Sequence, residues 1–361
     1  MLELGALPDE DALDDVLARF IPEFAYHSKN EVTLRQLLAH TSGLPAWLPL
    51  YARAESGAEA LRQLCDAELC YEPGTQVLYS DLGPILIGLL CERLSGETLE
   101  QLLRRRLFEP LGMNDTGYLP DPALRARCAA TELGSRFEQA MAEAQQKRQS
   151  LTTPLAPRAG FRQNLILGEV HDGNAHHALR GVSGHAGLFG TAADLVRFAQ
   201  AMLRGGLGDP ALGARPTTSA SSGGRVLGRA TVAEALSCQT EGLPLARGLG
   251  WQLLRKGALS RAEWGPAPAA VRLFPASGVS FPSLRPYGDL LSARTAGHTG
   301  FTGCSLAIDP ENDLIIALCT NRVHPDASRF AIGVVRPRFH NVIAASLVDP
   351  GEPPQHGAPG G

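Results

Sequence analysis

Lysine is scarce in this chain: it occurs only at Lys29, Lys147 and Lys256, so arginine supplies almost all of the 33 basic residues. With 37 acidic residues the net charge is −4, and no segment carries a dense run of basic side chains. A nucleic-acid interface needs such a run, so nucleic acid is excluded as the expected partner. Any reaction that uses a catalytic lysine has three candidates.

Long apolar segments and paired cysteines are also missing. No stretch reaches the roughly 18 apolar residues of a membrane-spanning helix, and the seven cysteines show no C-x-x-C spacing, so they are expected to be free thiols. The first 15 residues are acidic, unlike a secretory signal. If Met1 is the native start, the expectation is a cytoplasmic protein; a start upstream of Met1 leaves an extracytoplasmic location open.

What is present fits an ordinary globular protein: 361 residues, 44% hydrophobic and 19% charged. This length predicts two domains or one large domain with an insertion. Helix signals dominate the first half, where Ser or Thr precedes apolar residues at helical spacing. The predicted helices run from Thr33 to about Gly43, Ser80 to Gly96, Thr98 to Pro110, and Thr191 to Gly205, with an exposed charged helix over 135–150.

Strand signals lie near the end of the chain. Two β-prone runs, Phe301–Ile308 and Leu314–Thr320, flank a turn that contains Pro310 and predict a hairpin. Residues 205–230 and 257–290 are rich in Gly, Ser or Pro and predict surface loops. A closing helix is expected over 329–348.

These signals predict an α+β fold, in which an antiparallel sheet flanked by helices packs beside a mainly helical subdomain. The expected division is a connection over 1–30, the helical subdomain over 31–179, the sheet-containing portion over 180–348 and a disordered tail over 349–361.

Two short motifs carry residues suited to catalysis. Tyr79-Ser80-Asp81 precedes a predicted helix, where a Ser N-cap followed by Asp is common for structural reasons alone. His298-Thr299-Gly300 leads into the first predicted strand, whose free N–H groups can hold a developing oxyanion. Taken alone, each motif is better explained as an ordinary helix start or an ordinary strand start than as a catalytic site.

A third cluster is polar and rich in histidine. It places His171, Asp172 and His185 with further His and Glu residues in one short window. Its spacing lacks the His-Glu-x-x-His pattern of a zinc helix, so no metal is expected. His171 and Asp172 are candidates for the rim of a cleft, and a loop held by its own polar contacts is the alternative. His40 is expected to be structural, bonding a helix C-terminal carbonyl.

Taken together, these motifs resemble the serine β-lactamase-related family, which includes class C β-lactamases, penicillin-binding D-alanyl-D-alanine peptidases and related esterases. The resemblance rests on the motifs above and on the segments VTLRQLLAHTSGLP, EPGTQVLYSDLGPILIGLLCERLSG, FEPLGMNDTGY, GHAGLFGTAADLVRFAQAML and HTGFTGCSLAIDPENDLIIALCTNRVHP. It covers most of residues 15–345 and implies a β-lactamase/transpeptidase-like fold.

The family works by acyl transfer through three motifs: Ser-x-x-Lys, Tyr-x-Asn and Lys-Thr-Gly. The resemblance places Tyr79 and Asp81 in the second motif, with Asp for Asn, and His298, Thr299 and Gly300 in the third, with His for Lys. It implies proton transfer by Tyr79, substrate contacts by Asp81 and His298, and an oxyanion held by the Phe301 N–H. No cofactor is implied.

The first motif is absent. The residues three positions before the three lysines are Tyr26, Ala144 and Leu253, so the chain contains no Ser-x-x-Lys. The opening MLELGAL resembles the second half of the nucleophile helix, and the expectation is a sequence truncated before or within that helix. Without the motif lysine, Tyr79 is expected to be an ordinary neutral phenol.

The leading hypothesis is therefore hydrolysis of an amide or ester, such as a β-lactam, a D-Ala peptide or a carboxylic ester, by a serine that this chain lacks. The chain as given is expected to be inactive. Two alternatives stay open: an inactive relative that binds ligands, and a metal-assisted hydrolase using the His171–His185 cluster. The expected partner is a small-molecule or peptide substrate, with no membrane span, and the oligomeric state is not predicted.

Overall fold

The computed structural model describes residues 10–214, 225–254, 286–327 and 332–347. Their helices are α1 (Leu34–Leu38), α2 (Gly57–Asp66), α3 (Leu82–Ser95), α4 (Leu99–Leu103), α5 (Glu109–Leu111), α6 (Arg136–Arg148), α7 (Ala192–Leu203), α8 (Arg229–Leu236) and α9 (Ile332–Ala345). The strands are β1 (Gln252–Leu253), β2 (Ala296–Thr299), β3 (Ser305–Asp309) and β4 (Leu314–Leu318). The predicted tail, the first nine residues and most of the 257–290 loop lie outside the described residues.

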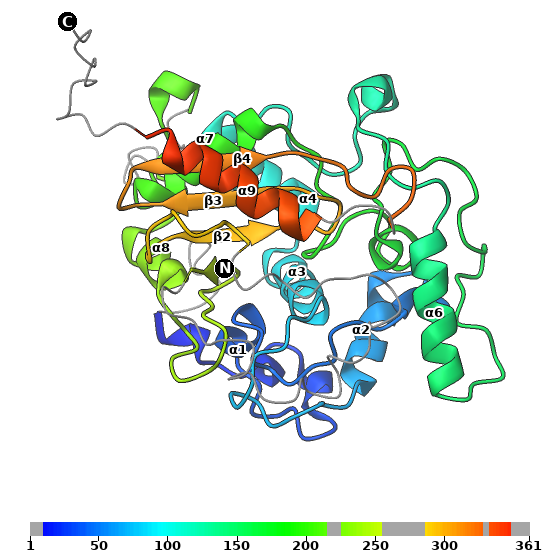
Figure 1. The fold of residues 1–361 in the computed structure, drawn as a ribbon. Helices are drawn as coiled ribbons and strands as arrows, with labels where there is room; N and C mark the ends of the chain where they lie inside the picture. Colours follow the sequence, from blue (N-terminus) through cyan, green and yellow to red (C-terminus); the bar gives the residue numbers. More distant parts are fainter. Residues whose placement is uncertain (1–9, 215–224, 255–285, 328–331, 348–361) are drawn as a thin grey trace, which may run out of the picture.

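The four strands form one antiparallel sheet in the order β1-β2-β3-β4. Alternate side chains face opposite sides, as the pleat requires. Ala296, Leu306 and Ile308 pack with Met202 of α7, whereas Ala307 and Ile316 belong to a second cluster with Phe339 of α9. Helices α7 and α9 therefore cover the two faces of the sheet (Figure 1).

A separate core joins α1, α2 and α3 in the helical part (Figure 1). Helix α3 supplies Leu82, Ile85 and Leu86 to this core, and α1 supplies Leu34 and Leu37. The expected α+β fold, an antiparallel sheet between helices beside a helical portion, is confirmed. The proposed subdomain boundaries at 30, 179 and 348 remain predictions. No helix among the described residues is long and apolar enough to cross a membrane.

Most predicted helix starts are confirmed by their caps. Thr33 and Thr98 both form complete capping boxes, and the Thr191 side chain accepts from the Asp194 N–H. The predicted cap position at Ser80 is off by one residue: Asp81 is the cap residue of α3, without a side-chain cap bond. The Ser80 hydroxyl makes two bonds: its oxygen accepts from the Leu82 N–H at 3.2 Å, at the start of α3, and its hydrogen is donated to the Pro45 carbonyl at 2.6 Å, which ties down the preceding loop.

Two further expectations need correction. Pro110 does not end the helix from Thr98, because it sits in the first turn of α5, where proline is tolerated, and the chain turns at Gly112. The segment 135–150 is a helix, as predicted, but Glu138 and Ala142 of α6 are buried, so it is not a fully solvated insertion.

The largest difference concerns the third motif. His298-Thr299 belongs to a strand of its own, β2, rather than leading directly into the hairpin strand, which begins only at Ser305. Between them the Gly300 N–H donates to the Cys304 carbonyl at 2.8 Å, and Gly303 has a φ of +132° that favours glycine. The turn places Phe301 at the end of the sheet.

Candidate active site

Tyr79 lies at the junction between the helical part and the sheet. Its ring centroid is 5.9 Å from that of His298 on β2 and 4.5 Å from that of His40, in the loop after α1. Tyr79 and His298 are half-buried, whereas His40 is buried. The structure therefore brings together two residues that the sequence motifs singled out separately.

His40 makes a structural contact, as expected, but with a different partner from the one predicted. Its Nδ1 accepts a hydrogen bond from the Ser80 N–H at 3.2 Å, rather than bonding a carbonyl at a helix end. Burial lowers the pKa of His40 well below its usual value. A neutral imidazole thus fixes the backbone next to Tyr79 and packs against the phenol ring.

Burial, with the nearby Asp81 carboxylate, raises the pKa of Tyr79 above its ordinary value. Burial and the positive charge of Arg247 lower the pKa of His298 to about 4. At neutral pH, both Tyr79 and His298 are therefore uncharged. This agrees with the sequence-based hypothesis that Tyr79 is a neutral phenol.

A titration tests this charge state. We expect that no phenolate signal at 295 nm attributable to Tyr79 appears below pH 10, because a buried phenolate is poorly solvated. The difference between the wild-type protein and Y79F isolates this residue, and Y26F, which alters an exposed phenol, provides the matched control. A Tyr79 midpoint below pH 9 would contradict the expectation.

Arg247 is the residue that the sequence reasoning missed. Its guanidinium carbon lies 5.6 Å from the Tyr79 ring centroid, and the residue is only 2% exposed. The signal in the sequence is a charged residue directly before Gly248-Leu249-Gly250-Trp251, inside an otherwise apolar and glycine-rich run. The sequence motifs offer Tyr79 no cation beyond His298, and Arg247 is a cation that they do not reveal.

Asp81 lies next to a buried ion pair. His185 Nε2 is 3.1 Å from Asp172 Oδ1, and His185 Nδ1 is 2.7 Å from the Ser183 hydroxyl. Burial raises the pKa of Asp81 to about 6, against the opposing effect of His185. Burial alone would raise the pKa of Asp172, but the charge and hydrogen bond of His185 outweigh it and hold that pKa at about 2.

The two predicted rim residues, His171 and Asp172, contact different groups. The His171 ring stacks on Phe301 with centroids 5.6 Å apart, and its Nε2 lies 3.1 Å from Glu132 Oε2. Of the four imidazoles in this window, those of His176 and His177 contact each other, whereas His171 and His185 bond to different carboxylates. In the described part of the chain, no three His, Cys, Asp or Glu side chains gather in a way that could hold a metal ion.

The turn after β2 is held from α9. Arg336 donates to the carbonyls of Gly300, Gly303 and Cys304, which fixes the backbone on both sides of Phe301. Phe301 is 39% exposed, and its ring lies under the Arg322 guanidinium. Its N–H makes no hydrogen bond to any described residue. A free, rigidly held N–H can serve as a donor to a bound group.

The family model described as Beta-lactamase matches residues 4–335. A protein of Escherichia coli strain K12, provisionally named D-alanyl-D-alanine carboxypeptidase, is 28% identical over 329 residues, which are 86% of this chain and 63% of that protein. The N-acetylmuramyl-L-alanine amidase of Bacillus subtilis strain 168 is 29% identical, over 82% of this chain and 57% of the amidase. The chain thus spans about three fifths of the length of these relatives.

Solved structures share the fold. A family VIII carboxylesterase superposes with a TM-score of 0.56 and 20% identity, over 94% of this chain and 79% of the esterase. A penicillin-binding protein homologue from Caulobacter crescentus gives a TM-score of 0.55 and 21% identity, over 89% and 72% of the two chains. At these identities the likeness concerns the arrangement of helices and sheet.

Proposed function

The chain belongs to the Beta-lactamase family, and from this we propose that its cleft serves the hydrolysis of an amide or ester through an acyl-enzyme on serine. The observation that carries the proposal is the contact between Tyr79 and His298, which come from two different motifs and lie with their rings 5.9 Å apart. The nucleophile belongs to a Ser-x-x-Lys motif that these 361 residues do not contain.

The other residues take roles around that serine. Tyr79, a neutral phenol, passes protons between the nucleophile and the leaving group. Asp81 accepts a hydrogen bond from the substrate or from the motif lysine. His298 and Thr299 orient the substrate along β2, and the free Phe301 N–H next to Gly300 binds the oxyanion. His171 and Asp172 lie at the rim of the cleft, where His171 supports the Phe301 ring.

The names of the relatives support a substrate class for this cleft. A carboxypeptidase acting on D-alanyl-D-alanine, a muramyl amidase and a carboxylesterase all cleave an acyl group from nitrogen or oxygen. We place the substrate of this cleft in the same class: a β-lactam, a D-Ala peptide or a carboxylic ester. Loops, rather than the shared motifs, decide between them.

A second candidate is an inactive relative that binds such ligands without cutting them. The observation that favours it is the absence of Ser-x-x-Lys from the chain. A metal-assisted hydrolase built on the His171–His185 cluster has no such support, because His171 bonds to Glu132 whereas His185 bonds to Asp172 and Ser183.

Fluorophosphonate labelling separates the two candidates. We expect a probe to label the protein purified from its native cells on a serine outside these 361 residues, and to leave the recombinant 361-residue chain unlabelled. Intact mass of the native protein, compared with 38.3 kDa, gives a second readout. A label on a serine within the 361 residues would contradict the assigned nucleophile, and an unlabelled native protein of 38.3 kDa would favour the binding protein.

A further inference from the structure

Two of the free cysteines lie opposite each other at one end of the sheet. In the pairing of β3 with β4, Ser305 lies opposite Leu318, so the next residues outward, Cys304 and Cys319, also face each other. Directly opposite residues of an antiparallel pair have Cα atoms about 4.5–5.5 Å apart. A disulfide accepts a Cα separation of about 4.4–6.8 Å. The fold therefore places these two thiols within bonding reach of each other.

The surroundings of Cys304 favour its thiolate form. A hydrogen bond from the Cys319 thiol has the largest effect on its pKa, and the positive charge of Arg336 acts in the same direction. Together these effects outweigh burial and lower the pKa of Cys304 below that of an ordinary cysteine. Cys304 therefore has a raised thiolate fraction at neutral pH, and the thiolate is the form that peroxides oxidise.

The two thiols also differ in exposure. Cys319 is exposed, whereas Cys304 is half-buried, so a small oxidant such as hydrogen peroxide suits it better than a bulky one. A cysteine of lowered pKa with a second cysteine beside it is typical of thiol redox sensors, because the second thiol converts the first oxidation product into a disulfide. Cys70 provides a contrast: the residue is exposed, but partial burial of its thiol raises its pKa.

We propose that Cys304 and Cys319 form a peroxide-sensitive dithiol, in which Cys304 attacks the oxidant and Cys319 closes the disulfide. The Cys304 thiolate attacks one oxygen of hydrogen peroxide, the O–O bond breaks, and the other oxygen leaves as hydroxide, which takes up the proton released by Cys304. The Cys319 sulfur then attacks the sulfur of the Cys304 sulfenic acid, and the hydroxide that leaves takes up the Cys319 proton. Two thiols and one peroxide thus give one disulfide and two water molecules.

The disulfide would form beside the turn that holds Phe301. The Cys304 carbonyl accepts from the Gly300 N–H at 2.8 Å and from Arg336 Nη2 at 2.9 Å. A bond from Cys304 to Cys319 would add a covalent tie to this turn. The dithiol itself does not depend on the proposed hydrolase function, because it uses only the two sulfur atoms and the peroxide.

The test follows the thiols of the reduced 361-residue chain in hydrogen peroxide at pH 7. Samples are quenched with iodoacetamide in denaturant and analysed by peptide mass spectrometry. Trypsin leaves both cysteines in one peptide, between Arg294 and Arg322, and Glu-C then splits it after Glu311, so a disulfide joins two fragments that reduction separates. We expect this linked product to form at least tenfold faster than Cys70 loses its thiol, and dithiothreitol to restore both thiols.

Three variants assign the roles. In C319S the serine hydroxyl can still donate to Cys304, but no disulfide can form, so dimedone is expected to capture a sulfenic acid at Cys304. In C304S we expect Cys319 to react no faster than Cys70. C70S is the matched control, with a rate of disulfide formation within twofold of the wild-type rate.

Oxidation of Cys304 and Cys319 no faster than that of Cys70 would overturn the proposal, and so would rapid capture of a sulfenic acid at Cys319 in C304S. If a variant does not fold, the wild-type chain in denaturing urea decides. Loss of the strand register there is expected to remove the rate advantage of the pair, and an advantage that persists in urea would show that the fold does not create it. Serine labelling is independent of every one of these results.

Discussion

Replacing Asp172 with alanine is expected to lower the free energy of unfolding by about 3 kcal/mol near pH 5.5. Asp172 Oδ1 accepts from the Ala175 N–H at 2.7 Å and lies 3.1 Å from His185 Nε2. The His185 side chain is only 3% exposed, so D172A leaves an imidazolium with little access to water. Urea unfolding of the wild-type protein and the variant measures the difference.

The penalty of D172A depends on pH with a definite sign. The pKa of Asp172 is held at about 2, below the roughly 3.9 of an unfolded Asp, so its contribution is present above about pH 4 and is lost as the pH falls toward 2. The carboxylate and hydrogen bond of Asp172 raise the pKa of His185 despite burial. That contribution is complete below about pH 6.5 and is lost as the pH rises through the raised value.

A surface ion pair provides the control. Arg19 and Asp15 lie 2.7 Å apart, and the arginine side chain is 55% exposed. D15A is expected to cost less than about 1 kcal/mol, because solvent screens an exposed pair. A D172A penalty no larger than that of D15A, or one that stays constant from pH 2 to pH 8, would show that the His185–Asp172 pair does not stabilise the fold.

Helix caps and turns that depend on residues close together in the sequence could be predicted from it. Thr33 and Thr98 cap their helices through residues three positions away, and the hairpin turn at Pro310 separates β3 from β4 as predicted. Such features depend on side-chain and backbone groups of the same short segment. The second bond of Ser80 has the opposite origin: its hydroxyl also donates to the Pro45 carbonyl, a partner that spacing along the chain cannot reveal.

The candidate site could be predicted only in part, because some of its contacts join residues that are far apart in the sequence. Tyr79 and His298 were predicted from a family resemblance that fixes motifs, and their rings lie in contact. Arg247 lies in none of these motifs, and its importance comes from burial and charge in the folded protein. His185 was named in the histidine-rich cluster, but its pairing with Asp172 appears only in the structure. Arg247 bridges to Gln252 of β1, which pairs with β2, and its side chain contacts Tyr79; neither periodicity nor composition encodes these pairings.

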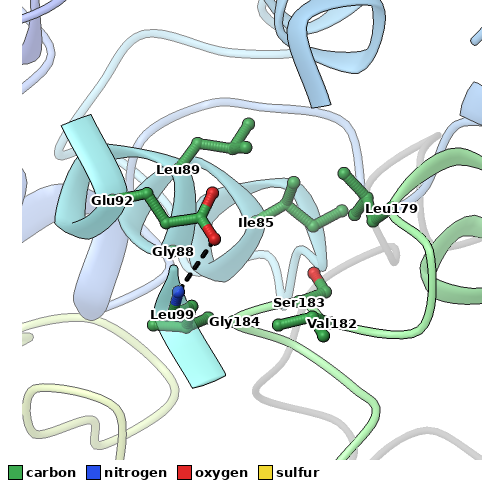
Figure 2. Close-up of a pocket in the computed structure, with 9 residues that line it drawn as sticks. All are labelled: Ile85, Gly88, Leu89, Glu92, Leu99, Leu179, Val182, Ser183 and Gly184. Carbon is green, nitrogen blue, oxygen red and sulfur yellow. Dashed lines mark hydrogen bonds between the residues drawn. The ribbon is translucent and has the colours of Figure 1, made fainter. Parts of the chain in front are cut away.

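A substitution at Gly184 tests how the His185 loop is held against α3. A Cβ added at Gly184 would lie 2.1 Å from the Pro84 carbonyl oxygen and 3.2 Å from the Gly88 N. Both contacts are to backbone, so a small side-chain movement cannot relieve them. Figure 2 shows Gly184 and Ser183 close to the face of α3 that carries Gly88, with Ile85 and Leu179 nearby.

G184A is therefore expected to cost about 3 kcal/mol in the free energy of unfolding, at the upper end of overpacking effects. To admit the methyl group, the loop must move away from α3. Ser183 and His185 flank Gly184, so this movement is also expected to weaken the 2.7 Å contact between their side chains. Urea unfolding measures the change in the free energy of unfolding, and the pH dependence of stability above pH 6.5 reports on His185.

G117A is the matched control, since no atom lies within 4 Å of a Cβ at Gly117. If G184A and G117A unfold at the same urea concentration, the loop is not packed against α3 as described, and the electrostatic support of Asp81 by His185 loses its structural basis.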